Sequence, residues 1–161
     1  MKSLLCILFT FVLWLLLTWS LQVREVLVGA MMAVLVATLL AHIYPDNMQK
    51  MFNPRRWFFL AVYIPYFLYL CVRSNLDVAY RVLHPDMPIR PGIVKVHTTL
   101  KSEIARTFLA NSITLTPGTL SVDIDGQDLY VHWINVRGED PEEHTAQIVK
   151  PFEGLLRRIF E

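Results

Sequence analysis

Few residues in this chain of 161 have the types and spacing that catalysis or metal binding requires. Cys6 and Cys71 lie inside apolar segments, and neither has a second Cys or a His at metal-ligand spacing. We interpret both as small buried hydrophobic side chains, with a redox or metal role as the alternative. Ser112 has no nucleophile elbow around it, and Cys71 has no base nearby in the sequence. The sequence therefore predicts a protein that is not an enzyme and has no catalytic residue.

Two further groups of polar side chains could in principle bind a ligand. His97, His132 and Asp123 lie on predicted strands, but no fixed spacing among them supports a metal site, and we predict neither a metal nor a cofactor. The second group is a run of short polar side chains between residues 111 and 116: Asn111, Ser112, Thr114 and Thr116. Such side chains commonly satisfy backbone groups at a helix end and in the turn that follows it. The alternative is that they contact a neighbouring subunit.

Charge divides the chain into two parts that would have to position these groups. Residues 1–83 hold seven Lys and Arg and three Asp and Glu, a net charge of +4. Residues 84–161 hold eight Lys and Arg and eleven Asp and Glu, a net charge of −3. We predict a membrane domain over 1–83 and a small soluble domain over 84–161. The chain contains no basic stripe or nucleic-acid motif, so we expect no nucleic-acid partner.

The first part contains two uncharged apolar stretches, residues 4–21 and 26–43. Each has 18 residues, which is near the minimum for crossing a hydrocarbon core of roughly 30 Å. We predict a transmembrane helical hairpin; a cleaved signal peptide is disfavoured because no small-residue cleavage site follows Ser20. The second stretch carries a small residue at every fourth position: Gly29, Ala33, Ala37 and Ala41. This stripe packs either on the first helix of the same chain or on a partner subunit.

A third apolar segment, residues 57–81, is crowded with aromatic side chains and contains Pro65. Arg55 and Arg56 beside Trp57 are candidates for anchoring anionic lipid, and a plain topology signal is the alternative. With two full spans, Lys and Arg divide six against one across the membrane; with three spans they divide four against three. Positive charge favours the cytoplasmic side. We therefore predict two spans, a third helix at the interface and a cytoplasmic C-terminal domain, with a third full span as the alternative.

Residues 84–161 have the pattern of a small α/β domain of order β-α-β-β-α. Asp125-Gly126 is a favoured hairpin pair. Asp140 followed by Pro141 predicts a helix start, and Pro151 is expected to divide that last helix. Residues 129–136 are apolar on both faces, which predicts a sheet covered on both sides. The other predicted elements are a strand over 93–98, a helix over 101–114 with Thr99 as its N-cap, and a strand over 120–124.

Residues 111–119, Asn-Ser-Ile-Thr-Leu-Thr-Pro-Gly-Thr, are followed by Asp123 and then by Leu-Tyr-Val-His at 129–132. This pattern, together with Ile-Arg-Pro-Gly-Ile at 89–93, resembles the E subunit of Mrp-type multisubunit cation/proton antiporters. The resemblance covers nearly the whole chain and is most specific over 89–132. It implies a multi-pass component of a bacterial or archaeal inner-membrane complex that exchanges sodium or potassium for protons.

In such complexes the large antiporter-like subunits carry the ion and proton paths, so the resemblance implies an accessory role for this chain. That expectation agrees with the two predicted spans, which contain no Asp, Glu, Lys or Arg. Its expected partners are the other subunits and membrane lipid. Two alternatives remain open: the equivalent subunit of a membrane-bound hydrogenase or formate-hydrogenlyase-like complex, and a membrane-tethered regulatory domain.

Overall fold

The chain forms two compact units that divide between Asn53 and Pro54. The computed structural model describes residues 2–39 and 53–161. The first unit, Met1–Asn53, contains helices α1 and α2, and the second, Pro54–Glu161, contains the remaining helices and strands. The boundary predicted from the distribution of charge, between residues 83 and 84, differs from this division. The reason is that the helix over 54–83 shares a hydrophobic core with the α/β part and therefore belongs to the same packed body.

Helices α1 (Lys2–Thr18) and α2 (Val23–Leu39) form an antiparallel pair in the first unit. Residues 19–22 join them, so the turn comes three residues earlier than the link over 22–25 that lies between the two predicted spans. The indole Nε1 of Trp14 donates a hydrogen bond to the carbonyl oxygen of Glu25 across the pair, at 3.1 Å. Residues 40–43 of the second predicted span lie outside the described residues.

Helix α3 (Pro54–Leu83) is a single helix of 30 residues that includes the predicted segment 57–81. Pro65 lies inside it, so one backbone hydrogen bond of the helix is missing there. Within residues 2–39 and 53–161, α3 is the one helix that is both long and apolar enough to cross a membrane by length and composition. The apolar helix Cys6–Thr18 in the first unit is shorter.

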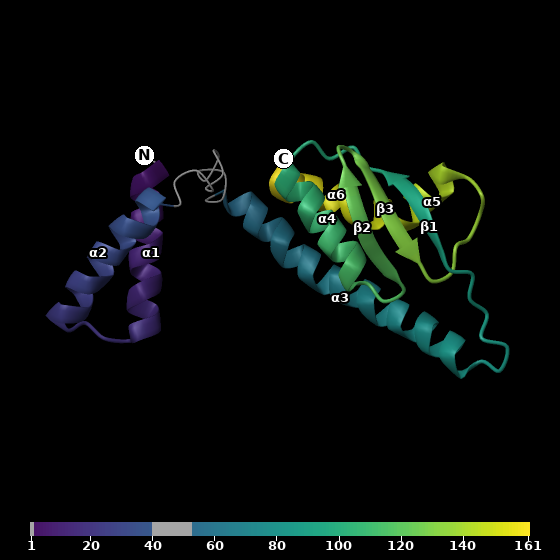
Figure 1. Ribbon diagram of the computed structural model, residues 1–161, viewed down its shortest axis with the longest axis horizontal. Helices are drawn as coiled ribbons and strands as arrows, with labels where there is room; N and C mark the ends of the chain where they lie inside the picture. Colours follow the sequence, from purple (N-terminus) through teal and green to yellow (C-terminus); the bar gives the residue numbers. More distant parts are fainter. Residues whose placement is uncertain (1, 40–52) are drawn as a thin grey trace. The chain divides into compact units, whose positions relative to one another are not determined.

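The second unit contains a three-stranded antiparallel sheet with the strand order β1-β3-β2 (Figure 1). The predicted hairpin turn at Gly126 joins β2 to β3, with Asp125 paired to Asp128 and a positive φ of 59° at the glycine. That conformation is open to glycine at little cost. The strands are β1 (Gly92–His97), β2 (Thr119–Asp125) and β3 (Asp128–Trp133).

Helices cover one face of this sheet. Val94 and Val96 of β1 and Leu129 and Val131 of β3 are buried in one core with residues of α4, α5 and α6. The neighbouring side chains on the other face, among them His132, are exposed. The prediction of a sheet covered on both faces is therefore wrong for this chain, because the helices of the second unit pack only on the face that carries Leu129 and Val131.

The helices of the α/β part are α4 (Glu103–Leu115), α5 (Pro141–Ile148) and α6 (Lys150–Phe160). Asp140 caps α5 as predicted, accepting a hydrogen bond from the backbone N–H of Glu142 at 3.0 Å. The terminal helix divides before Pro151, also as predicted. Thr99 is not the N-cap of α4; Ser102 occupies that position.

Glu153 in α6 and Glu161, directly after α6, hold the connection between β1 and α4 in place. Glu153 Oε1 accepts hydrogen bonds from the Thr98 hydroxyl at 2.9 Å, and from the N–H and hydroxyl of Thr99 at 2.6 and 2.9 Å. Glu161 Oε1 accepts from the N–H groups of Lys101 and Ser102, at the N-terminal end of α4. A carboxylate is favourable there because the helix dipole is positive at that end.

Burial of the Glu153 carboxyl raises its pKa, but the hydrogen bonds from Thr99 and Thr98, together with Arg157, more than offset this. The pKa of Glu153 therefore lies below its ordinary value in the folded chain. A lowered carboxyl pKa means that the ionised group stabilises the fold above its unfolded pKa. That stabilisation is lost as pH falls through the folded pKa.

We expect Glu153→Ala to lower the free energy of unfolding at pH 7 by about 2 kcal/mol, since several hydrogen bonds to one ionised oxygen are lost. The difference from the unsubstituted chain should shrink as pH falls below about 4, because the native carboxylate is then being protonated. Urea unfolding of the full chain in detergent, followed by circular dichroism at several pH values, measures both effects. Glu139→Ala, at an exposed position, is the control. A difference that stays constant from pH 7 to pH 3 would contradict the assignment.

Candidate functional site

The small-residue stripe of α2 faces α1 within the first unit. Gly29, Ala33 and Ala37 are the buried residues of α2, and Ala41 lies outside the described residues. A Cβ placed on Gly29 would lie 2.4 Å from Cδ1 of Trp14, so only glycine fits beneath that ring. In the described part of the stripe, the small residues therefore allow α2 to approach α1 of the same chain closely.

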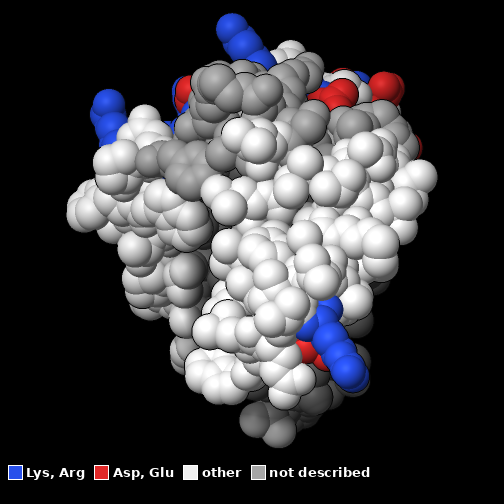
Figure 2. Space-filling view, turned by 90° about the vertical axis from the view of Figure 1, so that its left-hand side faces the viewer, with Lys and Arg blue, Asp and Glu red and all other residues white. Residues whose placement is uncertain are grey.

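A shallow apolar hollow of about 360 Å³ remains on the outside of the pair, lined by residues such as Phe11 and Val34. The charged residues of the two helices are Lys2, Arg24 and Glu25, all near helix ends. Figure 2 shows a broad uncharged surface in white, with blue Lys and Arg atoms and red Asp and Glu atoms toward its margins. Such a surface is suited to lipid or to apolar helices of other proteins.

The polar cluster 111–116 is mostly engaged within the fold. The Ser112 hydroxyl is buried, donates to the carbonyl oxygen of Phe108 and shares a hydrogen bond with the Tyr63 hydroxyl. The Thr116 hydroxyl donates to the carbonyl oxygen of Ser112, and the Thr114 hydroxyl accepts from the N–H of Ser121. Asn111 and Thr114 are nevertheless exposed on α4. The structure thus assigns local roles to three of the four residues and leaves the Asn111 side chain at the surface.

The three lipid-anchor candidates begin α3. Arg56 Nη2 donates to the carbonyl oxygen of Phe160 at 3.3 Å, so this residue ties α3 to the end of α6. The guanidinium of Arg55 lies over the ring of Phe59, 5.8 Å from its centroid. Trp57 is 59% exposed. Arg55 and Trp57 are therefore exposed at the start of α3, and Arg56 connects this end of α3 to the end of α6.

Helix α3 has one face docked on the α/β part along its length. Tyr63 is buried in the core, and the ring of Phe67 packs 6.4 Å from that of Phe152 in α6. Further along, Asp77 pairs with Arg137, and Arg81 donates to the carbonyl oxygen of Pro88 at 2.6 Å. The docked face thus extends from Arg56 to Arg81.

The opposite face of α3 is an exposed apolar stripe, which we call the α3 stripe. Its residues recur at spacings of three, four and seven, which places them on one side of a helix. Their exposure ranges from 40% to 67%. They are Phe58, Val62, Tyr69, Val72 and Leu76.

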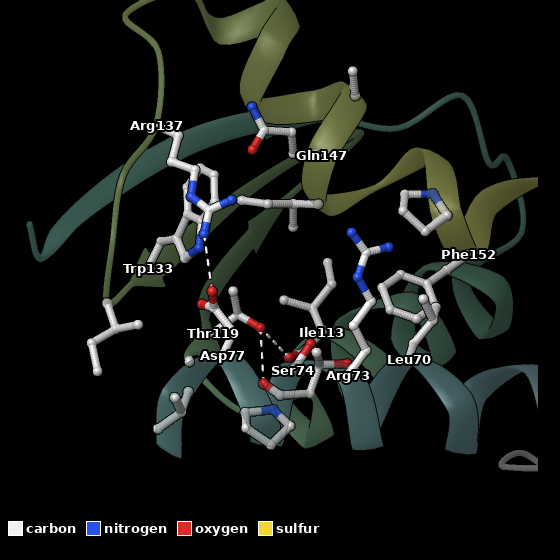
Figure 3. Close-up of a pocket in the computed structure, with 18 residues that line it drawn as sticks. Leu70, Arg73, Ser74, Asp77, Ile113, Thr119, Trp133, Arg137, Gln147 and Phe152 are labelled. Atoms are coloured by element: carbon white, nitrogen blue, oxygen red, sulfur yellow. Dashed lines mark hydrogen bonds and ion pairs between the residues drawn. The ribbon is translucent and has the colours of Figure 1, made fainter. Parts of the chain in front are cut away.

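A pocket of about 390 Å³ lies between α3, the 113–119 turn, the end of β3 and α5 (Figure 3). Leu70, Ile113 and Phe152 contribute apolar side chains to its wall. The side chains of Arg73 and Arg137 enter it from α3 and from the segment after β3.

Asp77 at the edge of this pocket is held by two guanidinium groups. Its carboxylate accepts from Arg81 Nε and Nη2 at 2.9 and 3.0 Å, and from Arg137 Nη2 at 3.2 Å. The spacing of four between Asp77 and Arg81 is a helical ion-pair signal that is readable in the sequence. Arg137 is 60 residues away and carries no such signal, which is why sequence reasoning missed this network and the pocket beside it.

Two of the three candidate metal ligands on the sheet, His97 and Asp123, have other partners, and His132 is exposed. His97 Nδ1 lies 2.8 Å from Asp128 Oδ1, and Asp128 also pairs with Lys95 Nζ at 2.7 Å. The hydrogen bond and charge of Lys95, with a further contribution from His97, hold the pKa of Asp128 below its ordinary value. Asp123 Oδ1 accepts from the N–H of Ile124. In the described ranges no three His, Cys, Asp or Glu side chains converge as metal ligands would.

Comparison with known proteins gives a consistent result over nearly the whole chain. A family model described as "Na+/H+ ion antiporter subunit" matches residues 7–159. The chain is 37% identical over 110 residues to the E subunit of the Na(+)/H(+) antiporter of Alkalihalophilus pseudofirmus, covering 67% of this chain and 68% of that protein. It is 29% identical over 156 residues to the E1 subunit of the Na(+)/H(+) antiporter of Staphylococcus haemolyticus, covering 92% and 91%.

A solved structure is also similar. A chain of the membrane-bound sulfane sulfur reductase, an archaeal respiratory membrane complex, superimposes with a TM-score of 0.79. The two chains are 44% identical, and the match covers 99% of each.

We expect Gly29→Leu to loosen the α1–α2 pair, because the new side chain must occupy the space of the Trp14 ring. Overpacking of this kind costs about 2 kcal/mol. Cys6 is 2% exposed in α1 and reports opening of the pair. In a Cys71→Ser background, its rate of maleimide modification should rise roughly 30-fold. Val28→Leu, on the exposed side of α2, is the matched control and should leave the rate unchanged; equal rates for both variants would contradict the packing.

Proposed function

The chain belongs to the family of Na+/H+ ion antiporter subunits, and on that premise we propose that it is the E subunit of a cation/proton antiporter complex, with a structural and not a transporting role. The observation that carries the proposal is the family match over residues 7–159, joined by relatives that are themselves antiporter E subunits. Its partners are the other subunits of that complex. It is a transporter component rather than a catalytic enzyme.

The residue composition of the first unit supports a structural role rather than a transporting one. Ion and proton paths through membranes require ionisable or polar coordinating groups at depth. Residues 4–21 and 26–43 contain no Asp, Glu, Lys or Arg. The stripe of small residues packs α2 on α1, which makes the pair a rigid apolar body. We propose that this pair spans the membrane as a hairpin and presents its apolar outer surface to neighbouring subunits and lipid.

The docking of α3 supports an interfacial position for this helix rather than a third span. Its contacts with the α/β part run from Arg56 to Arg81, which is about 37 Å of helix at roughly 1.5 Å per residue. A hydrocarbon core of roughly 30 Å is shorter than that. A spanning α3 would carry the charged α6, with Arg157 and Arg158, into lipid at several kcal/mol for each charge. An interfacial α3 instead places the α3 stripe in the lipid and Trp57 and Arg55 at headgroup level.

The distribution of Lys and Arg supports a cytoplasmic α/β domain. With α1 and α2 as the spans, six of the seven basic residues in 1–83 lie on one side with the C-terminal domain, and Arg24 lies on the other. Positive residues near membrane segments favour the cytoplasmic side. We propose that the complex resides in a bacterial or archaeal plasma membrane with this domain on the cytoplasmic face.

A second candidate is the corresponding component of a respiratory membrane complex. It is motivated by the similarity to the chain of the sulfane sulfur reductase complex, which covers 99% of both chains at 44% identity. The family match and the curated relatives favour the antiporter. A structural role fits both assemblies, since the apolar α1–α2 pair and the docked α3 would serve it in either one. The proteins that co-purify with the tagged chain distinguish the two: antiporter subunits alone, or antiporter-like subunits together with iron–sulfur proteins.

We expect Asn111→Arg combined with Thr114→Arg to reduce co-purification of neighbouring subunits at least several-fold. The reason is that these two exposed residues on α4 are the part of the polar cluster available to a partner. Affinity purification of the tagged chain from its host, with quantitative mass spectrometry, measures the effect. Gln127→Arg in the exposed β2–β3 turn is the control. If deletion of the whole chain left the complex assembled and transporting, the structural role would be wrong.

The position of α3 has a direct test in cysteine labelling from the two sides of the membrane. In a chain with Cys6→Ser and Cys71→Ser, we introduce Asn53→Cys before α3 or Asp86→Cys after it. An interfacial helix predicts that a membrane-impermeant maleimide modifies both from the cytoplasmic side only. Gln22→Cys, in the link between α1 and α2, should react from the opposite side. Labelling of positions 53 and 86 from opposite sides would establish a third span instead.

A further inference from the structure

The pocket beside α3 contains a cationic side chain, Arg73, that has no partner among residues 2–39 and 53–161. Arg73 lines the pocket, and its guanidinium makes no hydrogen bond or ion pair with any residue that the structure describes. Arg137 enters from the other side and is bonded to Asp77 through Nη2. The three charged residues of the lining, Arg73, Arg137 and Asp77, carry a net charge of +1.

The Asp77 carboxylate does not cancel the positive charge that an anionic ligand would meet in this pocket. Its two oxygens already accept from Arg81 on the side away from the cavity, in a paired geometry of 2.9 and 3.0 Å. With Arg81 included, the group holds three guanidinium groups against one carboxylate. The excess of positive charge is therefore available at Arg73 and at the free donors of Arg137.

The guanidinium groups of Arg73 and Arg137 in the pocket lining are suited to binding a phosphate group. Guanidinium groups bind phosphate through planar, charge-assisted pairs of hydrogen bonds. Ser74 and Gln147 add a hydroxyl and an amide to the same lining. A volume of about 390 Å³ falls within the range of roughly 300–1,000 Å³ typical of small-molecule sites.

The position of Arg73 on α3 connects the pocket to the α3 stripe. Arg73 follows directly after Val72 of the stripe, whereas Leu70 and Asp77 lie on the docked side. A phosphate held by Arg73 thus sits at the edge where apolar chains could follow Tyr69, Val72 and Leu76. That arrangement is suited to a lipid whose headgroup carries the phosphate.

We propose that this pocket binds a phosphate-bearing anion, supplied by the headgroup of an anionic phospholipid, with Arg73 and Arg137 as the ligands of the phosphate. The lipid source rests on the proposed interfacial position of α3, whereas the phosphate chemistry rests on the pocket alone. A soluble phosphate ester has the same recognition chemistry and is separated from the lipid by experiment.

The test is native mass spectrometry of the full chain released from non-ionic detergent micelles. Dioleoylphosphatidylglycerol, dioleoylphosphatidylcholine and sn-glycerol 3-phosphate are added in separate titrations. We expect phosphatidylglycerol to bind more tightly than phosphatidylcholine and glycerol 3-phosphate not to bind. Arg73→Gln should weaken phosphatidylglycerol binding on the order of tenfold, and Arg73→Lys should weaken it less because the charge remains.

Arg106→Gln is the matched control, since it removes the same charge from α4 outside the pocket. Because Arg73 has no intramolecular partner among the described residues, its substitution should leave the circular dichroism and thermal unfolding of the chain unchanged. Binding of glycerol 3-phosphate that depends on Arg73 would support the phosphate site and assign it to a soluble ester. Equal effects of Arg73→Gln and Arg106→Gln on every probe would overturn the proposal, whatever the cysteine labelling shows for α3.

Discussion

Helix α3 packs on the α/β domain along one face, and this contact determines which of its side chains are buried and which are exposed. A 30-residue helix that is long and apolar enough to cross a membrane packs, along one face, on the core that contains Tyr63. A helix face cannot be packed on a polar domain and on lipid at once. The consequence is a helix with two opposite apolar faces, one inside the protein and one, the α3 stripe, outside it.

The same division of roles recurs in the first unit. Small residues on α2 allow α1 to approach until the Trp14 ring lies over Gly29, and the outward side chains are large and apolar. Because the ionisable residues of these helices lie near their ends, the pair has little chemistry to offer at depth. Both units therefore combine a close internal contact with an apolar outer surface, which is the property that a protein needs to fit among other subunits and lipid.

Residues 111–119, which carry the family resemblance, show which features local sequence can predict and which it cannot. Its short polar residues, followed by Pro117 and Gly118, correctly indicate a helix end and a turn. The partner of the Ser112 hydroxyl is Tyr63, 49 residues earlier, and no local pattern indicates that pairing. The Thr99 prediction failed for a related reason: the carboxylates of Glu153 and Glu161, distant in sequence, bind the connection that a local N-cap would have organised.

Sequence alone determined the features that depend on neighbours along the chain: the apolar stretches, the Asp-Gly hairpin, the start of α5 at Asp140, the division at Pro151 and the family pattern over 89–132. Tertiary structure decided which faces those elements bury. Hydropathy measures how apolar a segment is and not what covers it, so it could not show that one face of α3 is docked on the α/β part. For the same reason, the meeting of Asp77 with Arg137 across 60 residues, and the pocket beside them, exist only in the folded chain.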